Sequence, residues 1–141
     1  ELIKKLSLGI LEEMGFEIAI NDLVDNFSKR HPKASINYFY DKSLNELIPQ
    51  SFEGRIYRII QEALTNISKH SNPKKINISF KFKNKKELEI RIFNNGVKNK
   101  PDKVSGVGLL GMTERVNQMN GKIKFKKKHN FEIIIILKVS T

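Results

Sequence analysis

Residues 52 to 70, FEGRIYRIIQEALTNISKH, decide the fold that the sequence predicts. Apolar residues recur here at spacings of three and four, the period of a helix with one buried face. They are Ile56, Ile59, Ile60, Ala63, Leu64 and Ile67. The opposite side carries Glu62, Asn66 and Lys69, with His70 on its flank,. We therefore expect an amphipathic helix whose polar side is either simply solvated or binds a ligand.

Regular alternation of apolar and polar residues predicts strands on both sides of this helix. The expected strands cover residues 36–40, 76–82, 88–92, 123–127 and 131–139. Helical spacing predicts three further helices. They cover residues 1–14, which Gly15 ends, residues 16–30, and a stretch from residue 109 that ends at Gly121,. Hairpins interleaved with helices indicate an α+β fold, a two-layer sandwich with helices packed on one face of a mixed, mostly antiparallel sheet.

The composition excludes several kinds of site. The 141 residues include no Cys, and the three His stand apart, so neither a disulfide framework nor a structural zinc site is expected,. The longest apolar run, residues 133–137, is too short to cross a bilayer,. The net charge of +11 attracts polyanions such as nucleic acid, anionic membrane or nucleotide phosphates,. Because only five of the 26 basic residues are Arg, reading of DNA bases by paired Arg contacts is disfavoured,.

Three separate stretches carry groups suited to a nucleotide. The amide oxygen of Asn66 is a hard ligand of the kind that Mg²⁺ accepts. Gly106 and Gly108 precede a helix, where small residues let backbone N–H groups approach an anion,. Between them, residues 94–96 (NNG) end a strand, and residues 97–105 form a polar loop without periodicity,. Each feature alone is common in a solvated face or an ordinary loop, but their combination and order are far more specific.

The combination resembles a known family. QEALTNISKHS (61–71), NNG (94–96) and GVGLLGMTERV (106–116) resemble the N, D and G boxes of the ATP-binding catalytic domain of two-component sensor histidine kinases. The sequences of the first and last boxes are similar to those of the branch that includes nitrate, hexose-phosphate and membrane-fluidity sensors. This branch belongs to the gyrase, chaperone, kinase and mismatch-repair ATPase superfamily. The resemblance implies an ATP-binding domain over residues 16–141. Residues 1–15 are similar to the tail of a dimerisation helix and its linker.

The resemblance implies a role for each polar residue of the first box. Asn66 would ligate Mg²⁺, and Glu62 would orient a metal-bound water or the metal itself. Lys69 and His70 would face the triphosphate. A metal ligand, a Lys and a backbone nest are a sufficient set for phosphoryl transfer, which depends mostly on positioning and charge neutralisation.

The two later boxes would complete the nucleotide site, with residues 97–105 as a short lid. The implied nucleotide contacts are Asn94, Gly96, Gly106, Gly108, Leu109 and Gly111. Asn94 stands where the family usually has an Asp that accepts a hydrogen bond from the adenine amino group. An amide oxygen still accepts that bond, but without the charge it is weaker by about 1 kcal/mol. Lys98 stands where the family has a second glycine.

The family phosphorylates a His that is followed by an acidic residue, and no His in this sequence has that neighbour. We therefore expect the phosphoacceptor upstream of Glu1, on a dimerisation helix, with sensor and membrane segments further upstream. The implied partners are that dimerisation and phosphoacceptor domain, within a homodimer, and a response regulator with a helix-turn-helix output domain. The implied location is the cytoplasmic part of a membrane-anchored sensor.

Two alternatives stay open at this stage. Asn94 in place of Asp makes a non-catalytic nucleotide-binding or docking module conceivable. The net charge and the Lys-rich hairpins, at residues 81–86 and 122–128, are the argument for a basic nucleic-acid-binding domain,. Lys-rich hairpins are usually solvated faces, so the protein-histidine kinase domain is the favoured hypothesis.

Overall fold

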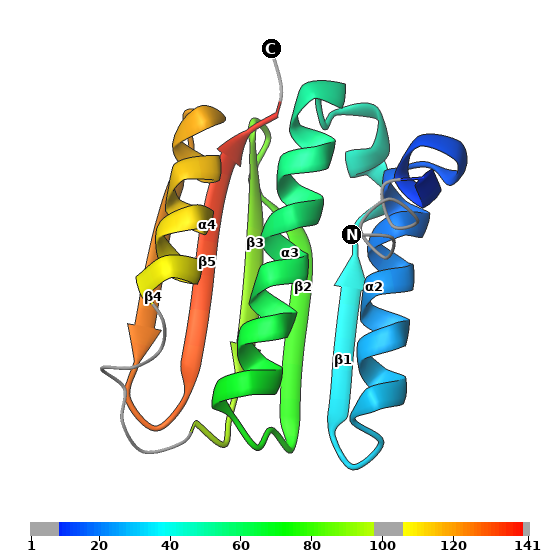
Figure 1. The fold of residues 1–141 in the computed structure, drawn as a ribbon. Coiled ribbons are helices and arrows are strands. Elements are labelled where there is room, and N and C mark those ends of the chain that lie inside the picture. The colour runs from blue at the N-terminus through cyan, green and yellow to red at the C-terminus, as the bar shows by residue number, and fades with distance from the viewer. Residues whose placement is uncertain (1–8, 98–105, 140–141) are drawn as a thin grey trace.

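The computed structural model describes residues 9–97 and 106–139. Residues 9–14 are helical. The elements that follow are α2 (Phe16–Arg30), β1 (Ser35–Tyr40), the 3₁₀ helix η1 (Lys42–Glu46), α3 (Gln50–His70), β2 (Lys75–Asn84), β3 (Glu87–Asn94), α4 (Gly106–Gln118), β4 (Lys122–Lys127) and β5 (Phe131–Lys138). Figure 1 shows α2, α3 and α4 on one face of a single sheet, and the described residues leave its other face open. The α+β two-layer fold is confirmed.

The sheet has five strands in the order β1-β2-β3-β5-β4. β1 pairs with β2 in parallel, and the other three pairings are antiparallel. The chain therefore inserts its last strand, β5, between β3 and β4. This agrees with the expected mixed, mostly antiparallel sheet.

The core lies between the sheet and the helical layer, with α3 at its centre. All six apolar residues that define the α3 stripe are buried. On β2 and β3 the even-numbered residues from Ile76 to Phe80 and from Leu88 to Ile92 are buried against the helices. Each fully buried Ile or Leu side chain stabilises the fold by roughly 1.5–3 kcal/mol, so burial of this stripe sets the rotation of α3 about its own axis. Its polar side is thereby directed away from the sheet.

Strand β5 departs from simple alternation, because Ile133, Ile134 and Ile135 are all buried. Ile134 points to the open face, where its neighbours across the two pairings are Arg91 on β3 and Lys124 on β4. Long basic side chains cover apolar surface with their stems while their charges stay in water. Two such neighbours explain how Ile134 is shielded on an open face.

The end of α4 differs from the prediction. The helix ends at Gln118, and the residue with a left-handed backbone is Asn120, with φ 56°. Gly121 is required for space: a Cβ there would lie 2.4 Å from Leu137 Cδ2 and 2.8 Å from the Ile136 carbonyl oxygen. The sequence pattern also missed η1, although Asp41 caps it by accepting a hydrogen bond from the Ser43 backbone N–H.

Among the described residues, none of the helices combines the length and the apolar character that a membrane span needs.

Candidate nucleotide site

The C-terminal ends of α3 and β3 lie at the bottom of Figure 1, and α4 starts at its lower end, above them in this view. These are the places of the three boxes that lie far apart in the sequence. The antiparallel return of β3 along β2 and the packing of α4 against α3 bring them together. The tertiary fold thus assembles one candidate site from the three stretches.

Glu62 and Asn66 lie one turn apart on α3 and face the first turns of α4. A Cβ at Gly108 would lie 3.0 Å from Asn66 Nδ2, and a Cβ at Gly111 would lie 3.4 Å from Glu62 Oε2. Real Cβ atoms rarely come as close as 3.0 Å to a neighbour, so Gly108 gives the Asn66 side chain its room, whereas a Cβ at Gly111 would be in ordinary contact with Glu62,. The predicted glycines of the third box are therefore neighbours of the predicted residues of the first.

Glu62 also forms an ion pair that the sequence reasoning missed. Arg115 Nη1, on α4, donates to Glu62 Oε1 at 2.8 Å. Each side chain is about one-third exposed (29% for Arg115 and 33% for Glu62). Arg115 stands in the quoted third box, four residues after Gly111, so its place on the same helix face was the available signal.

Two polar atoms at this contact are buried without a hydrogen-bond partner among the described residues. They are Glu62 Oε2 and Asn66 Nδ2. An unpaired buried polar group costs on the order of 1–3 kcal/mol, and so a polar ligand at this position would relieve it. Rotation of the Asn66 amide exchanges its nitrogen and oxygen. A carboxylate oxygen and an amide oxygen are ligands that suit Mg²⁺, and this donor set fits the predicted metal–nucleotide site.

Asn94 ends β3 and is almost fully buried, with 1% exposure. Its Nδ2 donates to Ser71 Oγ and to the Asn95 carbonyl oxygen, both at 2.9 Å. Ser71 follows α3 directly, so this pair ties the end of β3 to the end of α3. Because both bonds use the nitrogen, they fix the orientation of the amide. The sequence reasoning identified Asn94 but not its partner Ser71.

Gly96 has a left-handed backbone, with φ 72°, where the chain leaves β3. A Cβ at this position would lie 2.1 Å from the Asn72 carbonyl oxygen, and the Asn72 backbone N–H donates to the Gly96 carbonyl at 2.8 Å. Both the backbone angle and the close approach therefore require glycine. The glycine of the second box holds the loop beside the end of α3.

The remaining predicted residues lie around this contact. Lys69 is exposed and His70 half-buried on the last turn of α3. Gly106 begins α4, and Leu109 is half-buried and packs against the core. Of the predicted lid, residues 97–105, the part from Lys98 to residue 105 lies outside the described residues.

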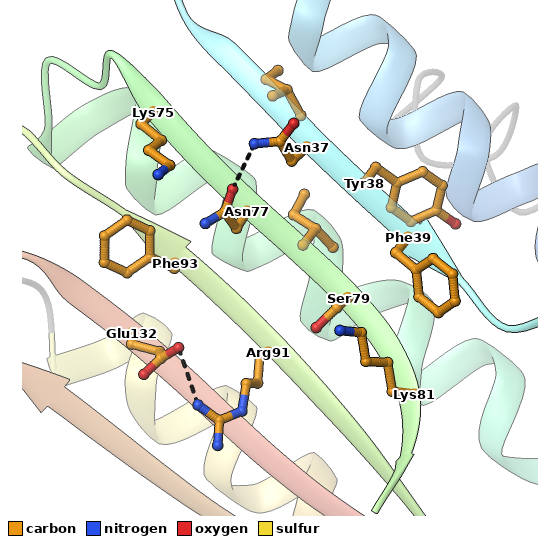
Figure 2. A pocket seen from close by; sticks show the side chains of 12 residues that line it. Asn37, Tyr38, Phe39, Lys75, Asn77, Ser79, Lys81, Arg91, Phe93 and Glu132 are labelled. Carbon is orange, nitrogen blue, oxygen red and sulfur yellow. Dashed lines mark hydrogen bonds and ion pairs between the residues drawn. The ribbon is translucent and has the colours of Figure 1, made fainter.

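A separate hollow of about 690 Å³ lies on the open face of the sheet. Figure 2 shows two pairs among its polar groups: Asn37 Nδ2 donates to Asn77 Oδ1 at 3.1 Å, and Arg91 Nη1 lies 3.5 Å from Glu132 Oε2. Its lining residues come from β1, β2, β3 and β5, and none belongs to α3 or α4. This hollow is not assigned to the nucleotide, because no described residue of the three boxes lines it. The hydroxyl of Tyr38, which lines the hollow, is also buried without a hydrogen-bond partner among the described residues.

Comparison with known proteins identifies the family of the chain. The family described as "Histidine kinase-, DNA gyrase B-, and HSP90-like ATPase" matches residues 52–141, and the chain belongs to this family. It is an ATP-binding catalytic domain of the sensor histidine kinase type. The resemblance predicted from the three boxes is thereby confirmed.

Two curated relatives illustrate the similarity. The sensor histidine kinase LiaS of Bacillus subtilis is 33% identical over 113 residues, which cover 79% of this chain and 30% of the relative. The histidine-protein kinase/phosphatase DegS of Brevibacillus brevis is 30% identical over 139 residues, 98% of this chain and 36% of the relative. The chain thus spans about a third of the length of these proteins.

Solved structures share the fold. A blue-light activated histidine kinase of Erythrobacter litoralis superposes with a TM-score of 0.71 at 13% identity, over 89% of this chain and 42% of the other. The histidine kinase AdeS of Acinetobacter baumannii gives a TM-score of 0.64 at 15% identity, over 99% of this chain and 78% of the other.

Proposed function

We propose that this domain binds Mg-ATP between α3 and α4 and transfers the γ-phosphoryl group to a His on a dimerisation helix of the full-length protein. The observation that carries the proposal is the pair of buried, unpartnered polar atoms on Glu62 and Asn66, next to the glycines of α4. Membership of the ATPase family supports nucleotide binding by this domain.

Each side chain has a role that its position supports. Asn66 and Glu62 would hold Mg²⁺, the second directly or through water, and the metal supplies neutralisation of phosphate charge. Lys69, exposed at the end of α3, would reach the phosphates, with His70 beside it. The Oδ1 atom of Asn94, whose amide orientation is fixed by Ser71, would accept the adenine amino group.

The N-terminal end of α4 would contribute the remaining phosphate contacts. Gly106 begins the helix and Gly108 lies in its first turn, at the end where the helix dipole favours an anion,. Leu109 directly follows Gly108, and Gly111 lies about one turn beyond Gly108,. Together with Gly96 at the end of β3, these residues would enclose the nucleotide.

The proposed partners belong to the full-length protein. As a member of a family with sensor-kinase relatives, the domain acts in two-component signalling with its own dimerisation and phosphoacceptor domain and with a response regulator that carries a helix-turn-helix output domain. Its place in the cell is the cytoplasm, where ATP is available.

Calorimetric titration with a non-hydrolysable ATP analogue, with and without Mg²⁺, tests the site. We expect saturable Mg²⁺-dependent binding that Asn66→Ala weakens by about 100-fold, because one metal ligand and a buried polar contact are lost together. Thr65→Ala is the matched control, since Thr65 is exposed on the same helix and its hydroxyl donates only within α3, to the Gln61 carbonyl. Absence of saturable binding by the unsubstituted domain would reject the proposal.

Phosphoryl transfer needs a second assay. The domain is mixed with the dimerisation segment of the full-length protein and labelled ATP, and acid-labile phosphohistidine is measured. Transfer would reject the alternative of a non-catalytic nucleotide-binding module. Nucleotide binding without transfer would favour that alternative.

A further inference from the structure

We propose that Arg115 is a positioning residue of this site: it holds one oxygen of Glu62 so that the other oxygen faces the metal and phosphates. The inference rests on the proposed function and extends it to a residue of α4. Arg115 acts through Glu62 and needs no contact with the nucleotide.

The two oxygens of the Glu62 carboxylate have different surroundings. Arg115 Nη1 donates to Oε1 at 2.8 Å, whereas Oε2 is buried without a partner among the described residues. A carboxylate that is free at both oxygens rotates about its terminal torsion, which is broad and roughly two-fold. One charge-assisted hydrogen bond removes that freedom and leaves a single oxygen for the ligand.

Arg115 also changes the net charge beside the proposed phosphate position. An unpaired carboxylate next to a triphosphate would repel it, because like charges a few ångströms apart destabilise each other at a protein surface. The guanidinium of Arg115 offsets the charge of Glu62,. The pair therefore keeps a metal ligand in place without a net negative charge beside the phosphates.

Gly111 lies directly beside the ion pair of Arg115 and Glu62. A Cβ on Gly111 would lie 3.2 Å from Arg115 Nη1 and 3.4 Å from Glu62 Oε2. The ion pair thus spans from α4 to α3 directly over this glycine, one turn beyond Gly108 and its neighbour Asn66. The two glycines thus lie beside the two α3 side chains, and Arg115 orients Glu62.

A merely structural link between the helices is the competing explanation, and the chain provides a matched control. Arg55 on α3 donates from Nε to Gln118 Oε1 on α4 at 3.0 Å. This is also an Arg that joins α3 to α4, but it lies near the start of α3, two turns from Glu62,. Arg55→Met removes a helix-to-helix bond without touching the carboxylate.

The experiment measures affinity for a non-hydrolysable ATP analogue by calorimetry over a series of Mg²⁺ concentrations, on the full chain. We expect Arg115→Met to lower the affinity at saturating Mg²⁺ by roughly 10- to 100-fold and to shift the half-saturating Mg²⁺ concentration upward, with less than about a two-fold change in the absence of Mg²⁺. Arg55→Met is expected to leave all three quantities within about two-fold.

A double-mutant cycle tests the route through Glu62. On a Glu62→Gln background, Arg115→Met is expected to change affinity by less than about two-fold, since the group it positions is already altered. Arg115→Lys keeps the positive charge but not the planar guanidinium, and we expect it to retain the affinity within about five-fold. If Arg115→Met fails to fold, Arg115→Lys is measured in its place. Thermal unfolding of each variant reports folding.

The outcomes separate this inference from the proposed function. If the unsubstituted chain binds no nucleotide, both fall. If it binds with Mg²⁺ and Arg115→Met leaves the Mg²⁺ dependence unchanged, only the positioning role falls. Equal losses for Arg115→Met and Arg55→Met, or losses that multiply in the double mutant, would also overturn it, because they would indicate general helix packing or a direct phosphate contact.

Discussion

At the scale of single residues, the glycines of this domain are not equivalent. Gly96 combines a left-handed backbone with a contact that admits no side chain, because a Cβ would lie 2.1 Å from the Asn72 carbonyl oxygen. Gly54, in the first turns of α3, has nothing within 4 Å of its Cβ position and lies in ordinary helical conformation. The same substitution should therefore act in opposite directions at the two sites.

Gly96→Ala is expected to lower the free energy of unfolding by about 2–4 kcal/mol, the sum of left-handed strain and displacement of the backbone at residue 72. Gly54→Ala is expected to raise it by about 0.5–1 kcal/mol, through helix propensity and a less flexible unfolded chain. Urea unfolding followed by circular dichroism measures both. Equal effects would contradict the account of Gly96.

At the scale of elements, the candidate site is a contact between two helices. α3 supplies the polar side chains, and α4 supplies glycines at the spacing of one turn, so that its backbone approaches α3 closely. α3 is held by its buried stripe on the sheet, and α4 by Met112 and Val116, which are fully buried. The polar residues of the site are thus positioned by apolar contacts on the opposite sides of their helices.

Gly108→Ala should separate stability from function at this contact. Its Cβ would lie 3.0 Å from Asn66 Nδ2 and 3.2 Å from Oδ1, so the amide must move. Because Ala favours a helix more than Gly does, we expect the free energy of unfolding to stay the same or rise by up to about 1 kcal/mol. Affinity for the Mg²⁺–nucleotide complex should fall by about 10-fold. Unchanged affinity in calorimetry would show that Asn66 tolerates the shift or does not bind the metal.

At the scale of the whole molecule, ligand binding should be visible as stability. A ligand that binds only the folded state at 100 times its dissociation constant adds about 2.7 kcal/mol. For a chain of this size we expect the melting temperature to rise by roughly 5–10 °C with ATP analogue and Mg²⁺. Removal of Mg²⁺ with a chelator should abolish most of the rise, as should Asn66→Ala. A rise of the same size without Mg²⁺ would argue against a metal in the site.

The sequence by itself determined the elements and the chemistry of the boxes. The stripe on α3 and the alternation of β2 and β3 could be predicted, because helical and strand periods are local properties of the chain. The candidate site residues Glu62, Asn66, Asn94 and the glycines were identified chiefly from the resemblance of the three boxes, and their roles stay predictions. The end of α4 and the helix η1 were missed, because periodicity reports neither the left-handed backbone of Asn120 nor the side-chain cap that Asp41 provides.

Only the tertiary structure decided which of these groups meet. The insertion of β5 between β3 and β4, the ion pair of Arg115 with Glu62 and the bond of Asn94 to Ser71 join residues that are 20 or more positions apart. The pattern of a single element shows which of its faces is apolar, but not what that face packs against. Contacts at such separations depend on the packing of the whole core, which turned α3 so that two of its polar atoms lie buried and unpaired beside α4.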